Sequence, residues 1–217
     1  MSQFLRNKKI LITAGPTWIN VDKVRVLTSI FSGTLGCVIA HEAKKEGAEV
    51  TLLLGPGQRH LKRDYLTGIQ VNYFKYFNDL FDLVKKEVST KEYDCIIHSA
   101  SVSDYQSTKP VQGKIKSNQR IVTLKLKPTP KIVKLMKKYD PKIFLVQFKL
   151  EIGISEKELI KRAYKSLLKN NSDIVVANDL NNIKLTRHKA LIIDKEKNIT
   201  KVKTKKELAH KLLEMVK

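Results

Sequence analysis

Residues 9–17 read KILITAGPT, and the fold class is predicted by working outward from this stretch. A short apolar run ends abruptly in Gly15-Pro16-Thr17, which predicts a buried strand that runs directly into a tight turn. Such a turn can hold a phosphate, or it can be only a corner of the chain. On these residues alone both interpretations stay open.

Downstream, the sequence alternates between strand-like and helix-like patterns. Strands are expected at residues 9–14, 49–54, 69–74, 93–98, 122–126, 143–148 and 173–177. Helices are expected at residues 33–46, 79–88 (with Asn78 as N-cap), 129–138, 155–169 and 204–217. The last two are expected to open with capping boxes, Ser155 with Glu158 and Thr204 with Glu207. Residues 190–194 and 199–202 are expected to form a hairpin.

The expected strands are short and apolar, which is typical of a parallel sheet covered by helices on both faces. No linker or shift in composition divides the chain. The sequence therefore predicts an α/β fold: an open, doubly wound parallel sheet, Rossmann-like, with a small added β hairpin or flap. A single domain is expected over residues 1–217.

Composition narrows the class of protein. The chain has 217 residues, 42% of them hydrophobic, and no run of eighteen apolar residues that could span a membrane. The first ten residues lack a secretory-signal pattern, so we expect a cytoplasmic protein. Cys37 and Cys95 are far apart in apolar stretches, which favours two buried thiols over a disulfide or a metal site.

The formal net charge is +21, which raises the possibility of a nucleic-acid partner. However, 35 of the 42 basic residues are Lys and only 7 are Arg, and they are spread over the whole length. Base recognition and bidentate phosphate binding usually recruit Arg. Nucleic-acid binding is therefore disfavoured, and the positive field would instead attract an anionic small substrate.

Three unusual segments follow expected strands: Gly15-Pro16-Thr17, the polar residues 99–116, and Asn178-Asp179. In open α/β sheets ligands bind at the carboxyl ends of the strands. Neither a Walker motif nor a dinucleotide fingerprint is present. The SGTLG run at residues 32–36 opens a helix, and it can serve as an anion site or as a plain N-cap.

The polar stretch after residue 98 is long for a compact domain, and loops of this length are usually functional or disordered. Asp104 stands where a carboxylate can hold Mg²⁺ or a ribose hydroxyl. Ten residues later, Lys114 could close over a triphosphate and stabilise the charge that builds during transfer, or it could be a solvated lysine. We expect a mobile active-site loop at about residues 106–120.

These segments, in this order, resemble the phosphopantothenate–cysteine ligase family, the ligase domain of the bifunctional coenzyme A biosynthesis flavoprotein in stand-alone form. The resemblance covers nearly the whole chain. It is carried by ITAGPT (12–17), DKVR (22–25), SGTLG (32–36), ASVSDY (100–105), KIKS (114–117), TPKIV (129–133), QFKLE (147–151) and VVAND (175–179).

The resemblance implies a two-step reaction. The carboxylate of 4′-phosphopantothenate attacks the α-phosphate of CTP or ATP, giving an acyl-nucleotide and pyrophosphate, and the amine of cysteine then attacks the acyl carbon. It also implies Mg²⁺, no flavin, a homodimer, and no membrane partner.

The resemblance assigns roles residue by residue. Lys114 and Arg25 would be catalytic, with Ser29 at a catalytic position, and Asp104 would hold the metal. The nucleotide would be bound by Gly15, Pro16, Thr17, Ser32, Gly33, Ala100, Ser101, Asp104, Phe148, Asn178 and Asp179.

One position departs from the family pattern. Ser29 stands where the family has an asparagine that contacts the acyl-nucleotide, and apolar Ile30 and Phe31 replace polar residues beside it. A serine offers one hydroxyl in place of an amide's donor and acceptor. Three explanations stay open: another group fills the role, the enzyme uses a different acid, or the chain is a diverged nucleotide-binding paralogue with lost or altered ligase activity.

Overall fold

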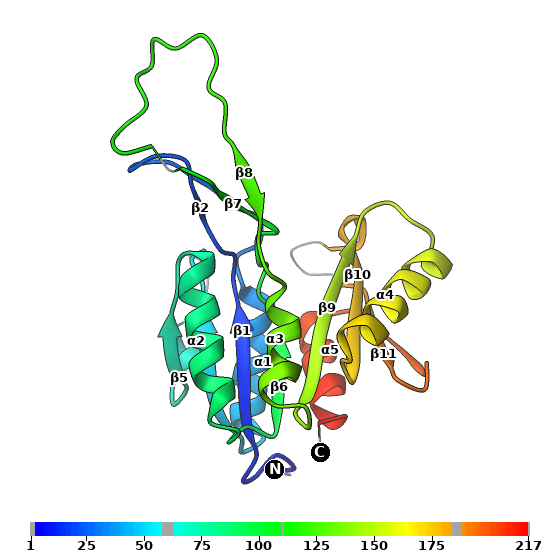
Figure 1. Cartoon of the computed structure of the whole chain (residues 1–217). Coiled ribbons are helices and arrows are strands. Elements are labelled where there is room, and N and C mark those ends of the chain that lie inside the picture. The colour runs from blue at the N-terminus through cyan, green and yellow to red at the C-terminus, as the bar shows by residue number, and fades with distance from the viewer. Residues whose placement is uncertain (1–2, 58–62, 110, 184–187, 217) are drawn as a thin grey trace.

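A computed structural model describes residues 3–57, 63–109, 111–183 and 188–216. Its main body is a sheet whose parallel strands are β1 (Lys9–Ala14), β4 (Glu49–Leu54), β5 (Gln70–Tyr73), β6 (Cys95–His98), β9 (Phe144–Glu151) and β10 (Ile174–Asp179). A hairpin of β11 (Ala190–Asp194) and β12 (Ile199–Val202) adds two antiparallel strands beside β10. The fold class and the hairpin predicted from the sequence are confirmed (Figure 1).

The strand order is β12-β11-β10-β9-β6-β1-β4-β5. The chain therefore moves from β1 toward β5 in one direction, and then crosses to β6 and continues in the other. This reversal places a topological switch point between β1 and β6, which is where open α/β sheets bind ligands.

Helices cover both faces of the sheet (Figure 1). One face packs against α1 (Thr34–Lys45) and α5 (Lys205–Glu214), the other against α2 (Phe77–Ser89), α3 (Ile132–Tyr139) and α4 (Glu156–Asn170). Side chains alternate along β1, so Ile10 and Ile12 enter the α1–α5 core and Leu11 the opposite one. Short 3-10 turns lie at Arg63–Leu66 (η1) and Leu180–Asn182 (η2).

Two helix starts confirm the capping residues expected from the sequence. The Ser155 hydroxyl accepts a hydrogen bond from the Glu158 amide at 3.3 Å, and the Thr204 hydroxyl accepts one from the Glu207 amide at 3.1 Å. Each satisfies an amide that the helix itself leaves unpaired.

Other boundaries differ from the prediction. The second helix starts earlier, with Tyr76 rather than Asn78 as N-cap, because the Asp79 carboxylate accepts from the Tyr76 amide at 2.9 Å. The third helix starts later, at Ile132, because Thr129 is turned away and its hydroxyl donates to the Ser103 carbonyl at 2.8 Å. The expected strand at residues 122–126 is wrong, since the ladder lies at residues 126–128.

Two small antiparallel pairs project beyond the carboxyl ends of the parallel strands (Figure 1). They are β2 (Ile19–Asn20) with β3 (Val26–Leu27), and β7 (Tyr105–Ser107) with β8 (Leu126–Pro128). We call residues 19–27, 105–109 and 111–128 the arm.

Both thiols are buried and free, as expected. Burial raises the pKa of Cys37 to about 12, so this thiol stays protonated at neutral pH. Among the described residues, no helix is long and apolar enough to cross a bilayer.

The first described residues and the end of α5 lie near the amino ends of the parallel strands, on the side away from the arm (Figure 1). Near the start, the Leu5 amide donates to the Glu46 carbonyl at 3.0 Å, just past the C-terminal end of α1.

Candidate active site

A cleft of about 810 Å³ opens at the carboxyl ends of β1, β6, β9 and β10, and therefore at the switch point. This volume suits a nucleotide-sized ligand. Eight of the residues that the sequence assigns to the nucleotide line it: Gly15, Ser32, Gly33, Ala100, Ser101, Asp104, Phe148 and Asn178.

The turn after β1 and the start of α1 lie against each other. Gly33 caps α1 with a φ of 79°, and a Cβ there would approach the Gly15 backbone nitrogen to 2.6 Å. Thr34, Leu35 and Gly36 then open the helix and line the cleft, and the first amides of a helix have no partner within it. Amides so placed favour an anion. The turn is thus a corner that also forms one wall of an anion-binding cleft.

Pro16 and Thr17 are absent from the cleft lining and instead join β1 to the end of β6. Thr17 is 1% exposed; its amide donates to the Ser101 carbonyl at 3.2 Å, and its hydroxyl accepts from the Ser103 amide at 2.8 Å. The Ser101 amide returns a bond to the Gly15 carbonyl at 2.9 Å. These bonds fix the strand end that presents Asp104.

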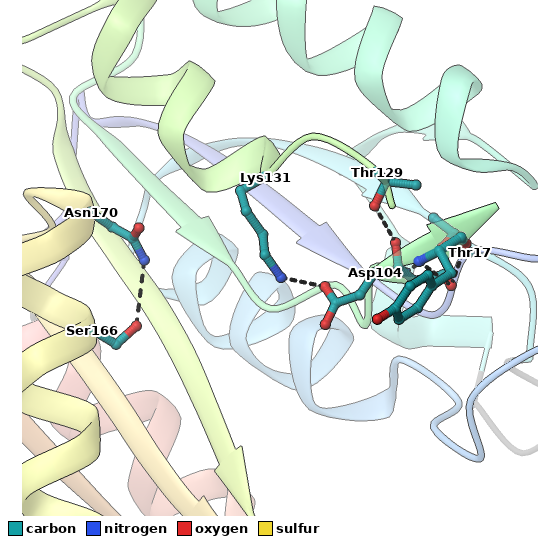
Figure 2. A network of polar contacts seen from close by, with 8 residues as sticks. Thr17, Asp104, Thr129, Lys131, Ser166 and Asn170 are labelled. Atoms are coloured by element: carbon teal, nitrogen blue, oxygen red, sulfur yellow. Dashed lines mark hydrogen bonds and ion pairs between the residues drawn. The ribbon is translucent and has the colours of Figure 1, made fainter. Parts of the chain in front are cut away.

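Asp104 forms an ion pair with Lys131 at the start of α3, with 2.5 Å between Oδ1 and Nζ (Figure 2). The Thr129 amide donates to the Asp104 carbonyl at 2.9 Å and holds the two segments together. In the parts of the chain that the structure describes, no group of three or more ligating side chains is suited to a metal ion. One carboxylate fits Mg²⁺ only when the ion is carried mainly by phosphate oxygens.

A polar cluster of Gln147 on β9 with Ser166 and Asn170 on α4 also lines the cleft. None of these three residues was assigned to the site from the sequence. Gln147 is 3% exposed; its Nε2 donates to Ser166 Oγ at 3.3 Å, and its Oε1 accepts from Asn170 Nδ2 at 2.7 Å. Figure 2 shows Ser166 and Asn170 across the cleft from Lys131. The spacing of Ser166 and Asn170, one helical turn apart, is the signal that could have revealed them.

The two residues that end β10 point in different directions. Asn178 lines the cleft, and its Nδ2 lies 2.9 Å from His188 Nε2. The Asp179 carboxylate accepts instead from the amides of Asn181 at 2.9 Å and Ile154 at 3.2 Å, and such backbone bonds lower its pKa. Asp179 therefore holds the loops together and does not reach the cleft. His188 was not identified from the sequence.

Two buried histidines in the cleft give stability a pH dependence. Burial lowers the pKa of both His98 and His188 to about 4, whereas an unfolded histidine has a pKa near 6.5. Between pH 6.5 and 4 only the unfolded chain binds these protons, so stability falls as the pH falls.

The free energy of unfolding should decrease by up to about 1.4 kcal/mol per pH unit for each histidine in this window. Urea titrations between pH 7 and 5 measure it. The His98→Gln variant should show a shallower slope, and a wild-type slope in this variant would contradict the assignment.

Arg25, Ser29 and Lys114 do not line the cleft of their own chain. Arg25 belongs to the arm, where its Nη1 lies 2.8 Å from the Asp22 carboxylate and donates to the Ile115 carbonyl at 3.4 Å. Lys114 precedes Ile115, so the structure brings the two cationic residues to the same part of the arm. Ser29 Oγ is buried and has no hydrogen-bond partner.

Asp22 organises this part of the arm. It is 4% exposed and accepts from the amides of Val24 at 2.9 Å, Arg25 at 2.7 Å and Ile115 at 3.0 Å. These bonds, first that to Ile115, lower the pKa of Asp22.

Replacing Asp22 with alanine should therefore free the loop around Ile115. Amide exchange at Ile115 is expected to accelerate about tenfold or more, because a bond to a charged group is lost. Hydrogen exchange followed by mass spectrometry measures this change. Asp82→Ala, at an exposed position on α2, is the matched control. Equal protection in both variants would contradict the role of Asp22.

Known proteins match this chain over nearly its whole length. Residues 5–217 match the family described as "DNA/pantothenate metabolism flavoprotein C-terminal domain". A curated relative from Thermococcus kodakarensis, named coenzyme A biosynthesis bifunctional protein CoaBC, is 35% identical over 210 residues, covering 96% of this chain and 50% of the relative. The chain spans about half the length of the curated relatives it matches.

Two solved structures are also similar to this chain over nearly its whole length. The DNA/pantothenate metabolism flavoprotein from Streptococcus pneumoniae has a TM-score of 0.85 and 34% identity, with 96% of this chain and 98% of that chain covered. The C-terminal domain of a CoaBC protein has a TM-score of 0.80 and 27% identity, with 99% and 96% covered. The family resemblance inferred from the sequence is confirmed, and this chain belongs to the DNA/pantothenate metabolism flavoprotein C-terminal domain family.

Proposed function

We propose that the chain joins 4′-phosphopantothenate to cysteine through an acyl-nucleotide made from CTP or ATP, in the cytoplasm and without flavin. The observation that supports this most is the open start of α1, packed on the Gly15 turn at the head of the cleft. Helix amides at that place suit a triphosphate. A structure of similar fold, a Cab2 mutant, is described as a complex with phosphopantothenate-cysteine, at 18% identity and a TM-score of 0.76.

The chemistry requires two displacements. A carboxylate oxygen of the acid attacks the α-phosphorus, and pyrophosphate leaves with the electrons of the broken P–O bond. The cysteine nitrogen then attacks the acyl carbon, loses its proton, and expels the nucleoside monophosphate. Orientation and charge neutralisation carry most of such catalysis.

The residues of the cleft and arm divide these tasks. Gly15 and the residues Ser32 and Gly33 at the start of α1 hold the triphosphate, and Phe148 forms a wall of the nucleotide pocket. Asp104 would hold Mg²⁺, and a bound Mg²⁺ would neutralise phosphate charge. Lys114, presented by the arm from an anchored backbone, stabilises the triphosphate charge in the transition state.

A second copy of the chain completes the site. The arm carries Arg25 and Lys114 outside its own cleft and exposes apolar side chains that a monomer would leave in water: Val24 is 65% exposed and Ile121 is 78% exposed. Large apolar side chains exposed on a projecting segment favour an interaction surface. Sedimentation velocity should therefore find a dimer, and a monomer at micromolar concentration would contradict this assembly.

A nucleotide-binding relative without ligase activity is the second candidate, favoured by Ser29. Its buried hydroxyl has no partner where the family pattern places an amide. Under this alternative the protein binds nucleotide but forms no acyl-nucleotide.

Pyrophosphate release separates the two. The purified protein is incubated with CTP, ATP, GTP or UTP, with and without 4′-phosphopantothenate. Ligation predicts release with CTP or ATP only when the acid is present, and a new amide product when cysteine is added. Nucleotide binding without any acid-dependent release would overturn the ligase proposal and support the second candidate.

A further inference from the structure

His188 is a buried polar group that the functions assigned so far do not use. It lies two residues before β11, is 5% exposed, and lines the cleft. Its ring is held from one side, where Nε2 meets Asn178 Nδ2 at 2.9 Å. The other ring nitrogen, Nδ1, is buried without a hydrogen-bond partner.

The contact with Asn178 fixes where the proton sits. In the assigned amide orientation, Asn178 Nδ2 can only donate, so His188 Nε2 accepts. A neutral ring then carries its proton on Nδ1. Burial and the charge of Lys205 lower the pKa of His188 to about 4, so the ring is neutral at physiological pH. The result is a buried N–H donor with no acceptor, an arrangement that costs stability until an acceptor arrives.

A cation lies beside this donor. Lys205, the first residue of α5, lines the same cleft and is close enough to His188 to act on it by charge. The described lining residues as a whole include five lysines and one carboxylate, and that carboxylate, Asp104, is already paired with Lys131. The charge of the cleft as a whole, and Lys205 at the His188 end in particular, therefore favour an anionic ligand.

We propose that His188 and Lys205 form an anion subsite of the cleft, in which His188 Nδ1 donates to an anionic oxygen of a reactant and Lys205 neutralises its charge. The proposal rests on the function proposed above and extends it. A phosphoryl oxygen of the nucleotide or pyrophosphate, and the carboxylate of cysteine, share the required chemistry.

The test uses His188→Phe, which keeps an aromatic ring and removes the donor. Calorimetry measures the Kd of pyrophosphate, CTP and ATP, and steady-state kinetics measure KM for cysteine. One of these constants should rise about tenfold or more, as for a lost bond to a charged group. His188→Asn, which restores an N–H donor, should recover part of the loss. His41→Phe, outside the cleft, is the matched control.

The pattern of change identifies the source of the oxygen. Weaker pyrophosphate and nucleotide binding assigns the subsite to phosphate, whereas an unchanged nucleotide Kd with a raised cysteine KM assigns it to the carboxylate. Constants within twofold of wild type, in a folded variant, would overturn the proposal, as would wild-type protein that binds none of these ligands.

The Lys205→Gln variant is a second test that should not disturb folding. Lys205 lies at the start of α5, and its side chain is not part of the hydrophobic core. It should weaken the same ligand, and the weakening should shrink at high salt. The binding measurements need no turnover. If His188 controls nucleotide binding but no acid-dependent pyrophosphate appears, the subsite stands and the ligase proposal falls.

Discussion

Replacing Lys114 with glutamine is expected to lower turnover by about 100- to 1,000-fold while leaving the Kd of the nucleotide nearly unchanged. Lys114 is exposed, yet the backbone on either side of it is fixed. The Gly113 carbonyl accepts from the Lys23 amide at 3.0 Å, and the Ile115 amide donates to Asp22 at 3.0 Å. The chain therefore presents this ammonium group outward from an anchored position.

Glutamine keeps most of the length of the side chain and removes its charge, so the variant tests electrostatic stabilisation rather than packing. Stopped-flow measurement of pyrophosphate release, with the acid present, follows the step that Lys114 is proposed to assist. Lys116→Gln is the control, because Lys116 is also exposed and lies only two residues away. Wild-type rates for Lys114→Gln, or equal losses in both variants, would remove Lys114 from the mechanism.

Replacing Gly33 with alanine is expected to abolish nucleotide binding and to destabilise the fold by about 2–5 kcal/mol. The φ of 79° is unfavourable for alanine, and the added Cβ would lie 2.6 Å from the Gly15 nitrogen and 2.8 Å from its Cα. Both atoms belong to backbone, so the clash cannot be relieved by a side-chain rotation. The start of α1 and the Gly15 turn must separate, and the amides facing the cleft move with them.

Gly68→Ala is the matched control for this variant. Gly68 has a φ of 71°, but the nearest atom to its added Cβ is Lys44 Cε at 3.2 Å, the flexible part of a side chain. It should show the backbone strain without the loss of binding. Thermal unfolding and calorimetric titration with CTP and ATP measure both effects. Nucleotide binding of wild-type strength in Gly33→Ala would contradict the placement of the triphosphate at this helix start.

Local sequence patterns were enough to predict most of the fold. Apolar runs such as residues 9–14 and 49–54 became buried parallel strands, and Ser155 and Thr204 became helix caps. The predictions failed where the secondary structure depends on pairing between residues that are far apart in the sequence. The strand expected at residues 122–126 lies at 126–128 because its pairing depends on β7, some twenty residues earlier.

Prediction of the candidate site from the sequence was limited in the same way. Motifs identified the strand ends and the helix start that line the cleft, including Gly15, Gly33 and Asn178. They gave no role to Gln147 or His188, whose contacts depend on neighbours from other elements. The motifs also could not indicate that Arg25 and Lys114 lie on an arm outside the cleft of their own chain. That arrangement depends on the hydrogen bond between Ile115 and Asp22, which are 93 positions apart in the sequence.

The position of the chain ends has a consequence for how this unit can be combined with others. Because the first described residues and the end of α5 lie near the amino ends of the parallel strands (Figure 1), a polypeptide joined there would emerge on the side of the sheet opposite the cleft. Its presence would leave the mouth of the cleft and the arm uncovered. Gene fusion at this end of the sheet is therefore structurally permitted, which agrees with curated relatives about twice as long.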